Sequence, residues 1–144
     1  MVQLAYFDTS LLVKRYVPES GSDELETYLC GQQPRLMVSE LSRLELTSTL
    51  QRKMRERVLT LALFNAMQHQ ADEDLLSGAI ELAALEGQVI SKGLILMRTL
   101  KQTVATLDAI HLATALVHNA DLFLTNDKQL ARAALEAGLQ VWPA

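Results

Sequence analysis

Two hydrophobic patterns alternate along the chain. Short apolar runs, several of them containing β-branched or aromatic residues, are bounded by polar and turn-forming residues, as buried strands are. They predict strands at residues 2–8, 34–40, 121–127 and 139–144. Between these runs, apolar residues recur at intervals of three and four, which is the spacing of one helix face. This pattern predicts helices within residues 9–20, 20–32, 39–58, 60–75, 86–102, 106–120 and 127–138.

Boundary residues mark several of these helices. Ser22 and Ser39 are candidate N-caps, because a hydroxyl can accept a hydrogen bond from a free N–H group of the first turn. Gly31 and Gly138 stand where two helices should end, and Pro18 interrupts the first helix. Residues 78–85 fit a third strand or the start of a helix, and periodicity alone does not decide between them.

The alternation of strand and helix predicts a three-layer α/β domain with a largely parallel sheet. Nothing in the pattern divides the chain, so residues 1–144 are expected to form a single domain. Sheets of this kind gather functional groups beyond the carboxyl ends of their strands, near the point where the strand order reverses. Asp8 and Asp127 each stand at the carboxyl end of a predicted strand. Both acids are therefore candidates for a site.

Composition narrows the class of protein. Hydrophobic residues make up 49% of the 144 positions and charged residues 21%, which is ordinary for a compact fold and unlike a disordered chain. Cys30 is the single cysteine, so neither an intrachain disulfide nor a cysteine-rich zinc site can form. The net charge of −4 argues against coating of nucleic acid by bulk positive charge. With no signal-peptide pattern and no membrane-length apolar run, a cytoplasmic protein without membrane contact is expected.

Two further acids stand among apolar residues. Glu45 is flanked by leucines and Asp108 begins the most apolar predicted helix, where an unpaired charge would be costly to bury. Each candidate acid also has a purely structural explanation. Asp8 or Asp108 can cap a helix, Asp127 can serve a turn, and Glu45 can pair with the nearby Arg43. Taken together, however, the four acids favour one shared site.

Four motifs in this order carry a family resemblance: YFDTSLLVK, ELSRLEL, TLDAIHLATAL and LFLTNDKQLARAA. Together they resemble the PIN domain, and most closely its branch of VapC toxins from bacterial toxin–antitoxin pairs. The resemblance spans nearly the whole chain. It implies a central, mostly parallel sheet of four or five strands between helices, and a metal-dependent endoribonuclease. It also implies an acidic site and two supporting hydroxyls, on these residues: Asp8, Glu45, Asp108 and Asp127, with Ser10 and Thr125.

Such an acidic site needs compensation. Carboxylates crowded together repel one another, and a divalent cation removes that repulsion. Oxygen ligands alone suit Mg²⁺ or Mn²⁺ rather than zinc. We expect Asp8 and Asp108 to contact the principal ion, Glu45 to orient the attacking water, and Asp127 to complete the site or recruit a second ion.

Basic residues and histidines offer weaker signals. Lys14 and Arg15 are close in sequence to Asp8 and are candidate contacts to substrate or partner. The basic run at residues 52–57 could guide RNA toward the acids, although a solvated helix face is the commoner meaning of such a run. His111, one helical turn after Asp108, either faces the site or a phosphate, as a candidate contact to substrate or partner, or is a packed core histidine.

The resemblance further implies partners: an RNA substrate, a small antitoxin protein and a second copy of the chain in a homodimer. One departure is Ala105, where VapC-like chains often have an arginine. Two alternatives stay open beside the toxin. The chain could be an RNA-processing nuclease without toxicity, or a catalytically silent PIN-like binding module.

Overall fold

The computed structural model describes residues 1–144, which form five strands and seven helices. The strands are β1 (Leu4–Phe7), β2 (Arg35–Ser39), β3 (Glu81–Ala83), β4 (Leu122–Leu124) and β5 (Gln140–Trp142). The helices are α1 (Thr9–Tyr16), α2 (Ser22–Gln32), α3 (Glu40–Arg55), α4 (Leu61–Leu76), α5 (Gly87–Thr99), α6 (Thr106–Val117) and α7 (Lys128–Glu136). Every predicted strand and helix is present, and the undecided residues 78–85 contain a strand, β3.

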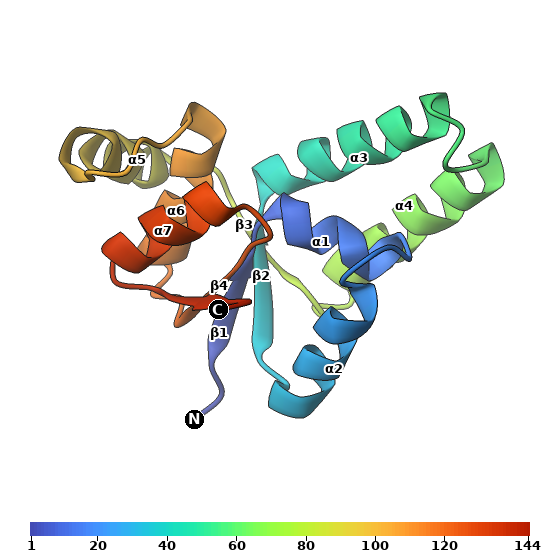
Figure 1. The fold of residues 1–144 in the computed structure, drawn as a ribbon, viewed down its shortest axis with the longest axis horizontal. Helices are drawn as coiled ribbons and strands as arrows, with labels where there is room; N and C mark the ends of the chain where they lie inside the picture. The colour runs from blue at the N-terminus through green and yellow to red at the C-terminus, as the bar shows by residue number, and fades with distance from the viewer.

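All five strands are parallel, in the order β3-β2-β1-β4-β5. The chain moves outward from β1 through β2 to β3 and then crosses to β4, on the other side of β1 (Figure 1). Strand order therefore reverses between β1 and β4. The carboxyl ends of these two strands form the switch point at which open α/β sheets place their sites.

Alternation along the strands sends side chains to two separate cores. Ala5 and Phe7 pack with apolar residues of α1 to α4 in one cluster, whereas Leu4 and Tyr6 pack with residues of α5 to α7 in the other. Figure 1 shows the two groups of helices on opposite sides of the sheet. The expected three-layer α/β architecture is confirmed, with an entirely parallel sheet.

Local structure confirms some of the expected helix boundaries and corrects others. Ser39 caps α3 by accepting a hydrogen bond from the Leu41 N–H group at 3.1 Å. The prediction that Ser22 is an N-cap was wrong. Gly21, with a φ of 96°, takes that position, and the Ser22 hydroxyl accepts instead from the Glu19 N–H group at 3.0 Å.

The predicted glycines at the C-terminal ends of α2 and α7 also differ in how they agree with the structure. Helix α2 continues one residue beyond Gly31 and ends at Gln32, and the residue that follows it, Gln33, is a non-glycine residue with a φ of 47°. Gly138 follows α7 with a φ of 96°, as expected for a glycine at a helix end. None of the helices is long and apolar enough to span a lipid bilayer.

Candidate active site

The four candidate acids line a single cleft of about 500 Å³ at the carboxyl edge of the sheet. Asp8 follows β1, Asp127 precedes α7, Glu45 belongs to α3, and Asp108 is the third residue of α6. We call this the acidic cleft. Its acids come from positions up to 119 residues apart in sequence, and the switch point of the sheet brings them together.

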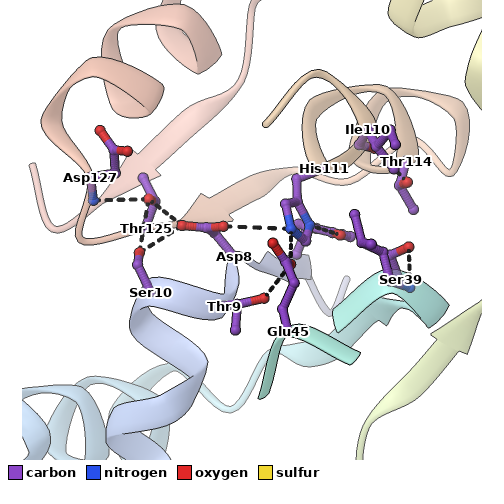
Figure 2. Close-up of polar contacts among 12 residues, drawn as sticks. Asp8, Thr9, Ser10, Ser39, Glu45, Ile110, His111, Thr114, Thr125 and Asp127 are labelled. Atoms are coloured by element: carbon purple, nitrogen blue, oxygen red, sulfur yellow. Dashed lines mark hydrogen bonds and ion pairs between the residues drawn. The ribbon is translucent and has the colours of Figure 1, made fainter. Parts of the chain in front are cut away.

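Asp8 is held by hydroxyl groups rather than by a helix terminus. It occupies the N-cap position of α1, but its carboxylate bonds no N–H group there. Its Oδ2 accepts hydrogen bonds from Ser10 Oγ at 2.6 Å and from Thr125 Oγ1 at 2.9 Å (Figure 2). The residue is 5% exposed, and its Oδ1 accepts no hydrogen bond from the protein, although it lies 3.8 Å from His111 Nε2. Thus one oxygen is fixed and the other is left for a ligand.

The two supporting hydroxyls also tie Asp8 to the loop after β4. Ser10 Oγ accepts from the Asn126 N–H group at 3.0 Å, and Thr125 Oγ1 accepts from the Asp127 N–H group at 3.1 Å. Figure 2 shows Thr125 between Asp8 and Asp127. Both hydroxyls therefore hold Asp8 and fix the chain leading to the next acid.

Glu45 is half-buried and bonds His111 and Thr9 rather than Arg43. Its Oε1 lies 2.5 Å from His111 Nε2 and 2.8 Å from Thr9 Oγ1. Burial alone would raise the pKa of Glu45, but the hydrogen bond and charge of His111 outweigh it, and the net pKa lies below its ordinary value. Glu45 is therefore held as a carboxylate with Oε1 fixed.

His111 lies behind the acidic cleft, not within it. The residue is 0% exposed, and its Nδ1 lies 2.6 Å from the hydroxyl of Tyr6 on β1. Burial would lower the pKa of His111, but the hydrogen bond to Glu45 and the negative charge of Asp8 raise it overall. The imidazole is thus packed in the core and also contacts an acid of the site. Both of the positions considered from the sequence, facing the site and packed in the core, describe it in part.

Asp108 is the acid on which repulsion acts most clearly. It does not cap α6, since Ala105 takes the N-cap position. Burial raises its pKa first, and the negative charges of Asp8 and Asp127 raise it further. Burial and the neighbouring negative charges thus act on the pKa of Asp108 in the same direction.

Asp127 combines a structural and a positional role. Its Oδ1 caps α7 by accepting from the N–H groups of Gln129 at 2.9 Å and Leu130 at 3.1 Å. Oδ2 accepts no hydrogen bond from the protein. The cap fixes the side chain at the rim of the acidic cleft while one oxygen stays available.

The donor set of the cleft fits a hard cation bound partly through water. As placed, no three groups among histidine, cysteine, aspartate and glutamate are close enough to form a closed metal cage. Mg²⁺ usually retains several water ligands and binds directly to only one or two carboxylates. The oxygens of Asp8, Glu45 and Asp127 that accept no hydrogen bond, together with Asp108, would be the ligands of such an ion. His111 offers no nitrogen to a softer metal, because Glu45 and Tyr6 engage both of its ring nitrogens.

The basic residues that line the acidic cleft belong to α3 rather than α1. The Lys14 ammonium bonds Glu19 at 3.2 Å and the Ser20 carbonyl at 2.6 Å, and Arg15 pairs with Asp74 at 3.7 Å; neither of the two basic residues lines the acidic cleft. Arg52 and Lys53 do line it, and Lys53 pairs with Glu19 at 3.1 Å.

Sequence reasoning missed three residues around the site. Thr9, which bonds Glu45, directly follows Asp8, so a hydroxyl beside a candidate acid was the available signal. Tyr6 lies two residues before Asp8, in the strand predicted before that acid. The sequence around Tyr6 gives no indication that it bonds His111. Glu19 lines the cleft without any sequence signal.

Solved structures with a similar fold include several toxins of bacterial pairs. A toxin–antitoxin complex from Klebsiella pneumoniae matches with a TM-score of 0.62 at 20% identity, covering 88% of this chain and 89% of that one. FitAcB from Neisseria gonorrhoeae matches with a TM-score of 0.72 at 15% identity, covering 95% of each chain. VapC20 from Mycobacterium tuberculosis, described as a toxin that cleaves the sarcin–ricin loop, gives 0.69 at 15% identity, covering 94% of this chain and 95% of that one.

At these identities the structural matches establish the fold. No curated protein matches the sequence. The model of the PIN domain family, by contrast, matches residues 5–136, which include all of the sheet but Leu4 and the last strand, and all four acids of the cleft. The chain therefore belongs to the PIN domain family.

Proposed function

We propose that this protein is a Mg²⁺- or Mn²⁺-dependent endoribonuclease that hydrolyses RNA phosphodiester bonds. One observation carries the proposal. Four acids from four separate elements surround one cleft, and in Asp8, Glu45 and Asp127 the protein fixes one carboxylate oxygen while leaving the other free. Acids that served only as helix caps or in ion pairs would have no reason to surround one cleft.

The chain's own residues divide the work. Asp8 and Asp108 would hold the principal ion, with Asp127 completing the site at the rim. Ser10 and Thr125 keep Asp8 oriented through its Oδ2. Glu45, fixed through Oε1, is suited to orient the attacking water. When bound, the cation would neutralise charge on the phosphoryl oxygens and make water more acidic.

We further propose that the nuclease is the toxin of a toxin–antitoxin pair and acts on RNA in the cytoplasm. Membership of the PIN family and the likeness to a structure described as a toxin–antitoxin complex support this. A pocket of about 410 Å³ between α3 and α4, lined by residues such as Leu12, Leu46 and Leu75, suits an apolar segment of a small antitoxin.

Two other surfaces support further partners. Helix α5 exposes apolar side chains that a homodimer would cover: Ile90, Leu94, Ile95 and Met97. Arg52 and Lys53, at the end of α3, border the acidic cleft and are suited to contact RNA phosphates.

Cleavage of RNA by the purified protein tests the activity. We expect cleavage with Mg²⁺ or Mn²⁺, none with chelator, and a loss of at least 100-fold in Asp8→Asn, because the amide keeps the size of the side chain but removes its charge. Asp121→Asn is the matched control. Asp121 lies at the opposite edge of the sheet, where its Oδ2 accepts the Leu4 N–H group at 2.8 Å, and an amide oxygen can still accept that bond. Equal cleavage by wild type and Asp8→Asn would refute the site.

Expression without any partner separates the toxin from an RNA-processing nuclease. Growth arrest that depends on Asp8 supports the toxin, and normal growth of cells that contain active protein supports a non-toxic enzyme. The absence of divalent-cation binding by calorimetry at millimolar concentration would instead favour a catalytically silent module.

A further inference from the structure

A chain of hydrogen bonds runs from the core of the protein to the acidic cleft. It joins Tyr6 of β1, His111 of α6 and Glu45 of α3, with distances of 2.6 Å from the tyrosine hydroxyl to Nδ1 and 2.5 Å from Nε2 to Oε1. Tyr6 and His111 are both 0% exposed. Figure 2 shows the imidazole ring beside Glu45 and Asp8.

The groups that can donate and those that can accept fix the direction of these hydrogen bonds. An ionised carboxylate only accepts hydrogen bonds, so Nε2 of His111 must carry a proton and donate it to Glu45. The Tyr6 hydroxyl can either donate to a neutral Nδ1 or accept from a protonated one. Nε2 donates to Glu45 in both cases. The arrangement therefore does not depend on the charge of the ring.

Glu45 is held from two directions at one oxygen. His111 donates from the α6 side and Thr9 Oγ1 donates from the start of α1, both to Oε1. With Oε1 occupied, Oε2 is the carboxylate oxygen left to meet a ligand in the acidic cleft. Asp8 is held in the same manner, by two hydroxyls at Oδ2. Both acids thus present one oxygen from a fixed side chain.

Packing alone does not account for an imidazole at this position. The neighbouring positions on α6 are filled by Leu112 and Ala113, which bury apolar side chains with no hydrogen-bonding requirement. A buried imidazole must find two partners, and here one of them is an acid of the cleft. A role in holding Glu45 explains why an imidazole occupies this position.

We propose that His111, braced by Tyr6, is a positioning residue that sets the orientation of the Glu45 carboxylate in the acidic cleft. The tests that measure catalysis rest on the proposed nuclease function. The orientation of Glu45 is itself a structural quantity that can be measured separately.

Substitutions at His111 test the effect on catalysis. His111→Phe keeps a ring but removes the donor, and we expect kcat for RNA cleavage to fall about 10- to 100-fold with little change in KM, since the ring does not contact substrate. His111→Gln places an amide N–H group near the position of Nε2 and should recover much of the loss. In a Glu45→Gln background, His111→Phe should cause no further loss, because both changes act on the same group.

Thr114→Val is the matched control. Thr114 is also buried on α6, but its hydroxyl bonds only the Ile110 carbonyl of its own helix, at 2.7 Å. We expect its kcat to equal that of wild type. Circular dichroism and thermal unfolding establish that each variant folds; if His111→Phe does not fold, Tyr6→Phe and His111→Gln carry the test, with smaller losses of kcat.

Two readouts do not depend on activity. Nitrogen NMR of the imidazole should show a protonated Nε2 whose resonance shifts in Glu45→Gln, and the crystal structure of His111→Phe should show Glu45 rotated or disordered. An unprotonated Nε2, or an unmoved Glu45 in His111→Phe, would overturn the inference. If wild type cleaves no RNA with any divalent cation, the proposed function fails, while these two measurements still decide whether His111 positions Glu45.

Discussion

Single carboxylates in this protein serve structure and site at once. Asp127 caps α7 through Oδ1 and keeps Oδ2 free at the rim of the acidic cleft. Glu45 is likewise bonded through one oxygen only. A cap or a hydrogen bond to the protein therefore does not argue against a functional role, because it is what holds the second oxygen in place.

Two substitutions at Asp127 separate its roles. Asp127→Ala removes both the cap and the charge, and we expect the free energy of unfolding to fall by about 1 kcal/mol and RNA cleavage to be lost. Asp127→Asn keeps a good capping residue, so its stability should stay within about 0.5 kcal/mol of wild type while cleavage is still lost. Urea unfolding and a cleavage assay measure the two effects. Full cleavage by Asp127→Asn would leave Asp127 with a capping role only.

Helix α3 is the element that joins the acids to a basic surface. It begins at a Ser39 cap on the sheet edge and carries Glu45 in its first half and three basic residues in its last turn. Cations in a last turn are favourable to any helix dipole, so their presence alone means little. Their placement is more informative, since Arg52 lines the acidic cleft whereas Arg55 does not.

We expect this difference to appear in RNA binding. Arg52→Gln should weaken binding several-fold and lower the slope of log affinity against log salt by about 0.7, the value for one contact to a single-stranded phosphate. Arg55→Gln, which removes the same charge from the same helix turn, should have a smaller effect on the slope. Fluorescence anisotropy with labelled RNA in an Asp8→Asn background measures binding without cleavage. Equal effects of the two variants would mean that α3 attracts RNA only by its overall charge.

At the scale of the whole molecule, we expect the acidic cleft to lower the stability of the fold. Asp108 has a raised pKa because of burial and of the charges of Asp8 and Asp127. Its contribution to stability is therefore fully present below its ordinary pKa of 3.8 and is lost as the pH rises through the raised folded-state value. Near neutral pH the ionised group opposes folding.

Removing that charge should stabilise the protein in the presence of chelator. We expect Asp108→Asn to unfold roughly 1–3 °C above wild type at about pH 7, an advantage that shrinks as the pH is lowered toward about pH 4. Added Mn²⁺ should raise the Tm of wild type by mass action and that of Asp108→Asn by less. Differential scanning calorimetry measures both.

Glu26→Gln is the control for this comparison. Glu26 is exposed on α2, outside the acidic cleft, so removing its charge should leave both the Tm and the response to Mn²⁺ unchanged. A Tm difference between Asp108→Asn and wild type that is independent of pH would contradict the proposed repulsion.

The sequence by itself determined the order of elements, the three layers and the set of candidate acids. Strand and helix periodicities are local properties, and the apolar run before Asp8 predicts a buried strand without knowledge of its neighbours. The same locality explains the one wrong cap and the one element that the sequence left undecided. The exact cap of α2 depends on how the chain turns through Gly21, and the short strand β3 becomes distinct from a helix only when it pairs with β2.

Only the tertiary structure decided which groups meet. Tyr6 and His111 are 105 positions apart, and His111 and Glu45 are 66 apart. No periodicity encodes such a pair, because it depends on how α3 and α6 pack on opposite faces of one sheet. For the same reason, folding placed Arg52 at the cleft and turned Lys14 toward Glu19, although Lys14 is far closer to Asp8 in sequence.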